Sequence, residues 1–284
     1  MTNSMTPSTS TALLILIGVC LGTLACDDNT GDNGPAIDNY YIEAAAEEGL
    51  TSETGASITE SQIVGTWTMG SIESGMYDEV DINADGSAVY RTYVDVEGAD
   101  WDETYDMSWE LEGSIFSAVM EVTDSEDGVT WTEFFQTSST AAVVGDQLIL
   151  GALIRTDGGS DGYDGTWKRF EAEKEDERAG DEYEIYSEVE TLTLNISGDT
   201  FIGTESWEEE WRWSFSGEID EGTDNGDNAL SGTVSQEGEY LVLRTTDEWY
   251  VYTLKPLSND VMLLAEDEPE YAEEYWEGAV FTRQ

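Results

Sequence analysis

The side chains able to do acid–base chemistry in this chain are carboxylates, tyrosines and three lysines. The 284 residues include no histidine, which excludes Ser-His-Asp and Cys-His nucleophiles, imidazole bases and His-ligated zinc or copper. With 63 acidic residues, some carboxylates lie close together by chance. The sequence therefore does not identify a particular pair that could catalyse hydrolysis. None of them lies in an apolar pattern that would raise its pKa. We therefore expect a non-catalytic protein, with a carboxylate-pair hydrolase as the open alternative.

One set of alternating Asp and Asn residues has a spacing that could bind a hard cation such as Ca²⁺. Asp81, Asn83 and Asp85, followed by Gly86, match the first half of an EF-hand calcium loop. The twelfth position is Thr92, where that loop needs a bidentate glutamate. Apolar–polar alternation on both sides favours a hairpin turn instead. Calcium at Asp81, Asn83 and Asp85 stays as the alternative, and no other cofactor is expected.

The charge balance limits the partners. With 10 basic residues the formal net charge is −53, which excludes nucleic acid and anionic membrane surfaces because both are bound through Lys and Arg. Such an acidic surface suits a salty medium, where screening shortens the repulsion between charges. Apolar residues make up 39% and aromatic residues 11%, which is enough for a packed core.

The N-terminal segment has the pattern of an export signal. Residues 12–25 form an apolar run of signal-peptide length, and Thr23-Leu24-Ala25-Cys26 is followed at once by polar sequence. This resembles the lipobox of bacterial lipoproteins, with Cys20 as a competing cysteine. The resemblance implies a signal peptide over 1–25, a lipid on Cys26, and anchoring to the outer or inner membrane of a bacterial cell envelope on its periplasmic or surface side. A secreted protein cut near Ala25 is the alternative.

The remaining sequence divides into a tether and a β-rich body. Residues 26–60 have the acidic composition of a flexible, disordered tether, with a short helix around Ile42 to Glu48. From Gln62 onward, apolar and polar residues alternate in short runs separated by Gly, Asp and Asn, which predicts antiparallel strands in a barrel or sandwich. The expected strands centre on 105–111, 116–122, 148–154, 192–196 and 211–215. The Asp-rich stretches 157–164 and 220–227 are interpreted as solvated turns.

The body also contains an internal repeat. Gly-Thr-Trp occurs at Gly65–Trp67 and again at Gly165–Trp167, and each copy precedes a strand, a turn glycine and a second strand. We expect two tandem antiparallel β-meander units at 61–172 and 183–284, joined by an acidic linker at 173–182.

These motifs resemble bacterial lipocalin-like barrels, in which a Gly-x-Trp tryptophan plugs one barrel end and an arginine of the last strand covers it. The resemblance makes Trp67 the plug of the first unit, with Arg169 or Arg155 over it, and Arg283 the residue that closes the second unit. Trp167 either ends the first unit or begins the second, and we favour the first choice.

The expected function follows from this architecture. A barrel rich in aromatic residues is typical of a binding module for a small apolar or aromatic ligand. The alternative is a structural or recognition lipoprotein that binds carbohydrate, divalent cations or a basic protein through its acidic aromatic surface. The partners are thus an unidentified small ligand or glycan, and the membrane through the lipid alone.

Overall fold

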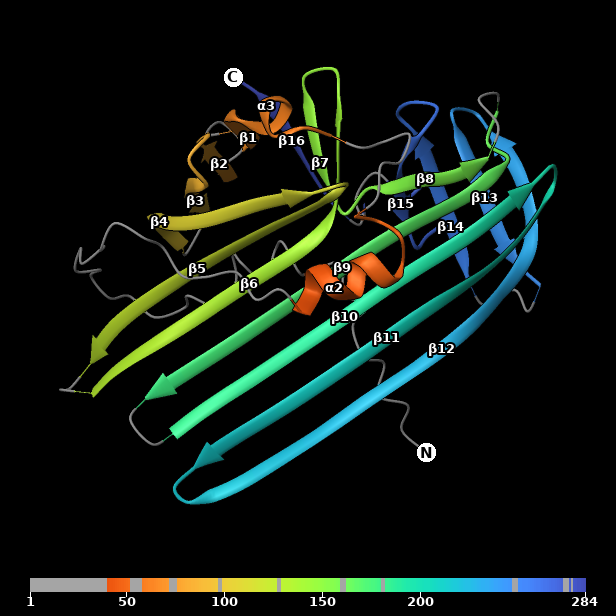
Figure 1. The fold of residues 1–284 in the computed structure, drawn as a ribbon. Helices are drawn as coiled ribbons and strands as arrows, with labels where there is room; N and C mark the ends of the chain where they lie inside the picture. Colours follow the sequence, from red (N-terminus) through yellow and green to blue (C-terminus); the bar gives the residue numbers. More distant parts are fainter. Residues whose placement is uncertain are drawn as a thin grey trace.

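A computed structural model describes residues 40–51, 58–71, 76–96, 99–126, 129–158, 162–179, 182–246, 250–272, 276 and 278–284. Most of these residues lie in antiparallel strands (Figure 1), which confirms the expected all-β class. Within these ranges no helix is both long enough and apolar enough to cross a bilayer.

Sixteen strands form one hydrogen-bonded sheet that closes on itself twice. The first closed barrel contains β1 (Gly65–Ser71), β2 (Met76–Ile82), β3 (Ser87–Val96), β4 (Ala99–Glu112), β5 (Ile115–Glu126), β6 (Val129–Val144), β7 (Gln147–Leu150) and β16 (Ala279–Arg283). The second contains β8 (Leu153–Gly158), β9 (Gly165–Ala179), β10 (Glu182–Ser197), β11 (Thr200–Phe215), β12 (Glu218–Glu237), β13 (Tyr240–Thr245), β14 (Val251–Pro256) and β15 (Val261–Ala265). The two Gly-Thr-Trp motifs begin β1 of the first barrel and β9 of the second.

The two repeats exchange their last strands. β16, at the end of the second repeat, pairs with β1 and β7 of the first barrel. β8, at the end of the first repeat, pairs with β9 and β15 of the second. The expected division at 61–172 and 183–284 therefore differs from the strand pairing, which places β8 and β9 in the second barrel and β16 in the first.

Two glycines mark the points where the chain crosses between the barrels. The alternation over 148–154 predicts one strand, but the structure divides it into β7 and β8 at Gly151. Gly151 and Gly278 have φ of +75° and +116°, and a Cβ on Gly278 would lie 2.5 Å from the carbonyl oxygen of Leu150. The inward positions change from even to odd at this break: Leu148 and Leu150 belong to the core of the first barrel, whereas Leu153 belongs to the core of the second and Ile154 to a separate cluster.

The barrels are joined side by side by two long strands, β6 and β9. β6 pairs with β9 from Thr132 to Ser139, so β5, β6 and β9–β12 form one twisted sheet (Figure 1). At the far end of this sheet both barrels open. The pairing of β4 with β5 reaches only to Met107, and the pairing of β12 with β13 only to Gly232. Of the acidic segment 173–182, expected to be a linker, residues 173–179 belong to β9 and Glu182 to β10. Residues 220–227, expected to be a turn, lie within β12.

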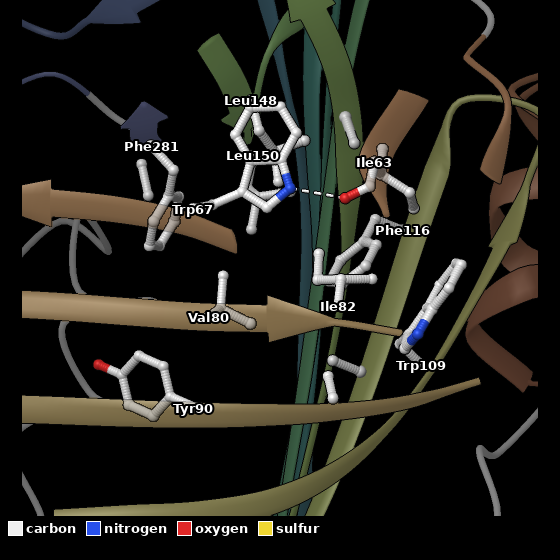
Figure 2. Packing of buried hydrophobic residues seen from close by; sticks show 14 of the residues in the cluster. Ile63, Trp67, Val80, Ile82, Tyr90, Trp109, Phe116, Leu148, Leu150 and Phe281 are labelled. Carbon is white, nitrogen blue, oxygen red and sulfur yellow. Dashed lines mark hydrogen bonds between the residues drawn. The ribbon is translucent and has the colours of Figure 1, made fainter. Parts of the chain in front are cut away.

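Each closed barrel has a core of its own large side chains. In the first, Trp67 is fully buried among Ile82, Phe116 and Phe281, and its Nε1 donates a hydrogen bond to the carbonyl of Ile63 (2.6 Å; Figure 2). Ile63 belongs to the short helix α3 (Glu60–Ile63), which stands over this end of the barrel. The second core surrounds Trp167 and Tyr252.

A third apolar cluster fills the junction on the outer side of the barrels. The helix α2 (Tyr40–Glu47) covers it, with Tyr41 and Ala45 buried against Phe170 and Ala172 of β9. The expected short helix is therefore confirmed, but the tether does not extend to residue 60 as predicted. Its last part packs on the body because Tyr41, Ala45 and Leu50 supply an apolar face.

Candidate functional site

The two Trp plugs are covered by arginines from the exchanged strands. The guanidinium of Arg283 lies 4.5 Å from the ring centroid of Trp67, and that of Arg155 lies 4.7 Å from Trp167. Both arginines donate to a backbone carbonyl five residues before the tryptophan, those of Gln62 and Gly162. The expected cation–π cover is present at both ends, but the assignment was wrong. Arg283 closes the first barrel, and Trp167 begins the second under Arg155.

Arg169, the other arginine expected to cover Trp67, lies elsewhere, on β9. Its position on β9 is two residues beyond Trp167, so its side chain has the same inward orientation, and it forms a salt bridge with Glu171. Beyond this pair the inner face of the long strands leaves the closed core. Arg169 thus marks the boundary between the apolar interior and an acidic surface.

That surface consists of four rows of side chains across β9, β10, β11 and β12, which we call the acidic–aromatic face. Residues directly opposite each other in an antiparallel pair share a face, so the register defines the rows. The rows, each written from β9 to β12, are Glu171, Glu190, Trp207 and Gly226; Glu173, Glu188, Glu209 and Asp224; Glu175, Tyr186, Trp211 and Gly222; and Glu177, Glu184, Trp213 and Asp220. These rows contain neither Lys nor Arg.

The second row places four carboxyl groups on adjacent strands, about 5 Å apart from one strand to the next. Burial, followed by the charges of Glu188 and Glu175, raises the pKa of Glu173 to about 8. Burial and the charge of Glu190 raise the pKa of Glu188 to about 7. The protonated forms of both groups are therefore favoured relative to an exposed glutamate. Sequence analysis found no apolar pattern that would raise the pKa of an acid, whereas here the burial comes from the assembled sheet.

Neighbouring hydrogen bonds organise this row. The hydroxyl of Tyr186 donates to Oε2 of Glu188 (2.9 Å), and burial with the adjacent carboxylates raises the pKa of Tyr186. A hydrogen bond between Glu188 and Glu190 also contributes to the raised pKa of Glu188. Shared protons are the usual solution when like charges are held close together.

Tryptophans of β11 lie across glycines of β12. A Cβ placed on Gly222 would be 2.1 Å from Cζ2 of Trp211, and one on Gly226 would be 2.4 Å from Cζ2 of Trp207. Any larger residue would collide with these rings. The glycines therefore let two half-buried indoles extend flat over β12, on either side of the acidic second row.

Apart from Arg169, the basic residues of these strands lie on the opposite face of the sheet. Lys168 forms a 2.7 Å salt bridge with Glu48 beside α2, Arg178 a 2.6 Å salt bridge with Asp176, and Arg212 a 3.5 Å contact with Glu221. The sheet thus separates charge between its faces, and the field over the inner face is negative.

The expected calcium residues form part of a hairpin. Asp81 accepts hydrogen bonds from Thr66 and Arg91 at 2.6 Å each, which hold its pKa below the usual range. Asp85 accepts from the backbone and hydroxyl of Ser87, and Asn83 donates to that hydroxyl. In the part of the chain that is described, no three acidic or cysteine side chains are grouped so that they could hold a metal ion.

One pattern in the sequence could have indicated the acidic–aromatic face. Glutamates recur at 171, 173, 175 and 177, with period 2, and the last three lie in the segment interpreted as a linker. Alternation was sought among apolar residues only, so this strand was missed. Cys26, the expected site of lipidation, lies outside the described residues.

Comparison with protein-family models, curated proteins and solved structures finds no match to this chain. The lipobox and lipocalin-like resemblances therefore rest on the residues quoted above. What the chain does must be argued from its own geometry.

Proposed function

We propose that the protein is a non-catalytic recognition module, anchored in a bacterial envelope through Cys26, that binds a positively charged partner on its acidic–aromatic face. The observation that carries this proposal is the four-row arrangement of carboxylates and indoles on the inner side of β9–β12. The anchor is proposed from the lipobox-like sequence alone.

Electrostatics favours a cation at this surface. Burial, followed by the charges of neighbouring carboxylates, raises the pKa of Glu173 and Glu188, so a further negative charge at this face is unfavourable. A cationic group would relieve this repulsion and displace the bound protons. Indole faces beside the carboxylates add cation–π attraction of about 0.5–2 kcal/mol per contact.

The first expectation, a small apolar ligand inside a barrel, has less support. The described interior positions of both barrels are occupied by large side chains such as Trp67, Phe281, Trp167 and Tyr252, each buried in a contiguous cluster. A glycan could stack on Trp207 and Trp211, but a neutral sugar would leave the neighbouring carboxylates without compensating charge. The surface alternative with a basic partner is therefore the one we adopt.

A titration with labelled octalysine tests the proposal, with a neutral oligosaccharide and a fatty acid as competing probes. We expect octalysine alone to bind, with an affinity that falls as salt rises. The variant E173Q/E188Q/E209Q should bind it at least about tenfold more weakly.

The matched control removes charge from the other face of the same sheet. Glu208 and Glu210 are exposed on β11 and alternate with Trp207, Glu209 and Trp211. The variant E208Q/E210Q should bind octalysine nearly as the parent chain does. Equal losses in both variants would show that net charge, not the face, attracts the peptide. Selective binding of the sugar or the fatty acid would support the other functions.

A further inference from the structure

The strand β12 has a long edge with no partner among the described strands. It pairs with β11 from Glu218 to Thr233, but with β13 only from Gly232 to Glu237. Residues 218–230 are therefore paired on one side only, and in Figure 1 they form the rim of the large sheet. A free edge of this length presents unpaired backbone donors and acceptors.

Two backbone hydrogen bonds identify which residues face this edge. The carbonyl of Ser231 accepts from the amide of Thr246 (2.8 Å), on the β13 side, whereas the amide of Val234 donates to Asp199 (2.9 Å), on the β11 side. The register with β11 is continuous, so odd-numbered residues from 219 to 231 direct their backbone groups toward the open edge. The amides of Glu221 and Asn225 donate to the side chains of the preceding aspartates. This fits the assignment of odd-numbered residues to the open edge, where the amides have no strand partner.

The edge is acidic and lined by aromatic rings. It carries five acidic residues and no Lys or Arg over 218–231: Glu218, Asp220, Glu221, Asp224 and Asp227. On the inner side, Trp207 and Trp211 extend over Gly226 and Gly222 toward this rim. A strand laid beside β12 would place every second side chain next to Asp220, Gly222, Asp224 and Gly226.

We propose that this edge of β12 binds an extended Lys/Arg-rich segment of the partner as an added β-strand. The inference rests on the proposed function and specifies how the partner is held. Backbone hydrogen bonds to residues such as Thr223 and Asp227 supply the pairing, and alternate cationic side chains lie between Asp224 and the two indoles. An ammonium group on the added strand also replaces the amide as the partner of the Asp220 and Asp224 carboxylates.

Charge complementarity selects this occupant over a second copy of the chain. Two β12 edges placed together would bring their acidic residues into contact, and like charges opposite each other in a strand pair are destabilising. The Asp220 and Asp224 caps and this repulsion keep the edge from pairing with itself. A basic strand is attracted by the same groups.

A pair of peptides separates strand addition from simple charge attraction. The first is an eight-residue peptide of alternating Lys and Thr, and the second has the same charge but N-methyl groups on two consecutive central residues, which block both of its edges. We expect the methylated peptide to bind the full chain at least about tenfold more weakly at the same ionic strength. Equal affinity of the two peptides would overturn strand addition and leave the proposed function standing. Failure of both to bind would refute the proposed function.

A variant of the edge provides the reciprocal test. Proline is tolerated where an edge-strand amide points away from the sheet, so T223P should fold and lose binding of the unmodified peptide. T223V keeps the amide and should bind normally. Because proline can disturb the strand, hydrogen exchange of the unmodified protein gives a second measurement. The peptide should slow exchange at Thr223, Asn225 and Asp227, and unchanged exchange at these amides would also overturn the inference.

Discussion

At the residue scale, the raised pKa values of Glu173 and Glu188 link folding to pH. The folded chain keeps these carboxyl groups protonated up to about pH 8 and about pH 7, whereas in an unfolded chain they ionise near pH 4.5. Between these values the folded state binds more protons than the unfolded state. The stabilising contribution is therefore complete below the unfolded pKa and is lost as pH rises through the folded pKa.

The expected result is a free energy of unfolding that falls between about pH 5 and pH 8, by on the order of 1 kcal/mol per pH unit for each proton taken up. Glutamine mimics the protonated acid, so E173Q/E188Q should flatten this part of the curve and be more stable than the parent at pH 8. Urea denaturation across the pH range measures both, with E208Q/E210Q as the exposed control. A parent curve that stays flat, or rises, over this interval would contradict the assignment.

Residue chemistry of this kind was only partly accessible from the sequence. The Gly-Thr-Trp motif and the arginines that cover its tryptophans could be selected because an aromatic plug and a guanidinium have specific shapes. The sequence could not predict which arginine covers which ring, because Arg155 and Arg283 make the same contacts in their respective barrels. The raised pKa of Glu173 depends on cross-strand neighbours, which no local pattern reveals.

At the element scale, the exchange of β8 and β16 makes the two barrels interdependent. Thr68 of β1 lies opposite Thr282 of β16, and its hydroxyl donates to the carbonyl of that residue at 3.4 Å. If each repeat closed on its own last strand instead, Thr68 would face β8, where Ile154 is the counterpart of Thr282 because each precedes the covering arginine. The two arrangements can be distinguished by which cysteine pair forms a disulfide.

In a chain with Cys20 and Cys26 replaced by serine, we expect T68C/T282C to form an intramolecular disulfide under mild oxidation and T68C/I154C to remain reduced. Opposed residues in antiparallel strands have the Cα separation that a disulfide requires. Thiol titration and the mobility of the oxidised chain on a denaturing gel report the link. A disulfide in T68C/I154C with none in T68C/T282C would show that the repeats close independently.

The sequence predicted most strands but not their partners. Alternation at 105–111, 116–122 and 192–196 identified β4, β5 and β10 because each has one apolar face. The exchange was not predictable, since β8 and β16 carry similar short apolar patterns and fit either barrel. The acidic strand portions of β9 and β12 were interpreted as linker and turn, because the apolar contrast that marks a half-buried strand is absent there.

At the scale of the whole molecule, the distribution of charge matters more than its total. The net charge is −53, yet the described Lys and Arg side chains near the long strands pair on the outer face or at the barrel ends. Beyond Arg169, the four rows of the inner face contain carboxylates, three indoles, Tyr186 and two glycines, with neither Lys nor Arg. The molecule can therefore attract a basic partner to one side of its large sheet while the other side packs against α2.

This arrangement predicts opposite effects of salt on folding and on binding. Screening shortens the range of charge repulsion from about 10 Å at 0.1 M to about 3 Å at 1 M, so the melting temperature should rise with sodium chloride and level off near 1 M. Choline chloride should have the same effect if screening is the cause, whereas sucrose of equal osmolality controls for solute exclusion. Over the same range octalysine should bind more weakly, because its attraction is screened too. A melting temperature that is constant or falls with salt would mean that repulsion within the acidic–aromatic face is already neutralised by bound protons, and the face would then have little charge left with which to attract a cation.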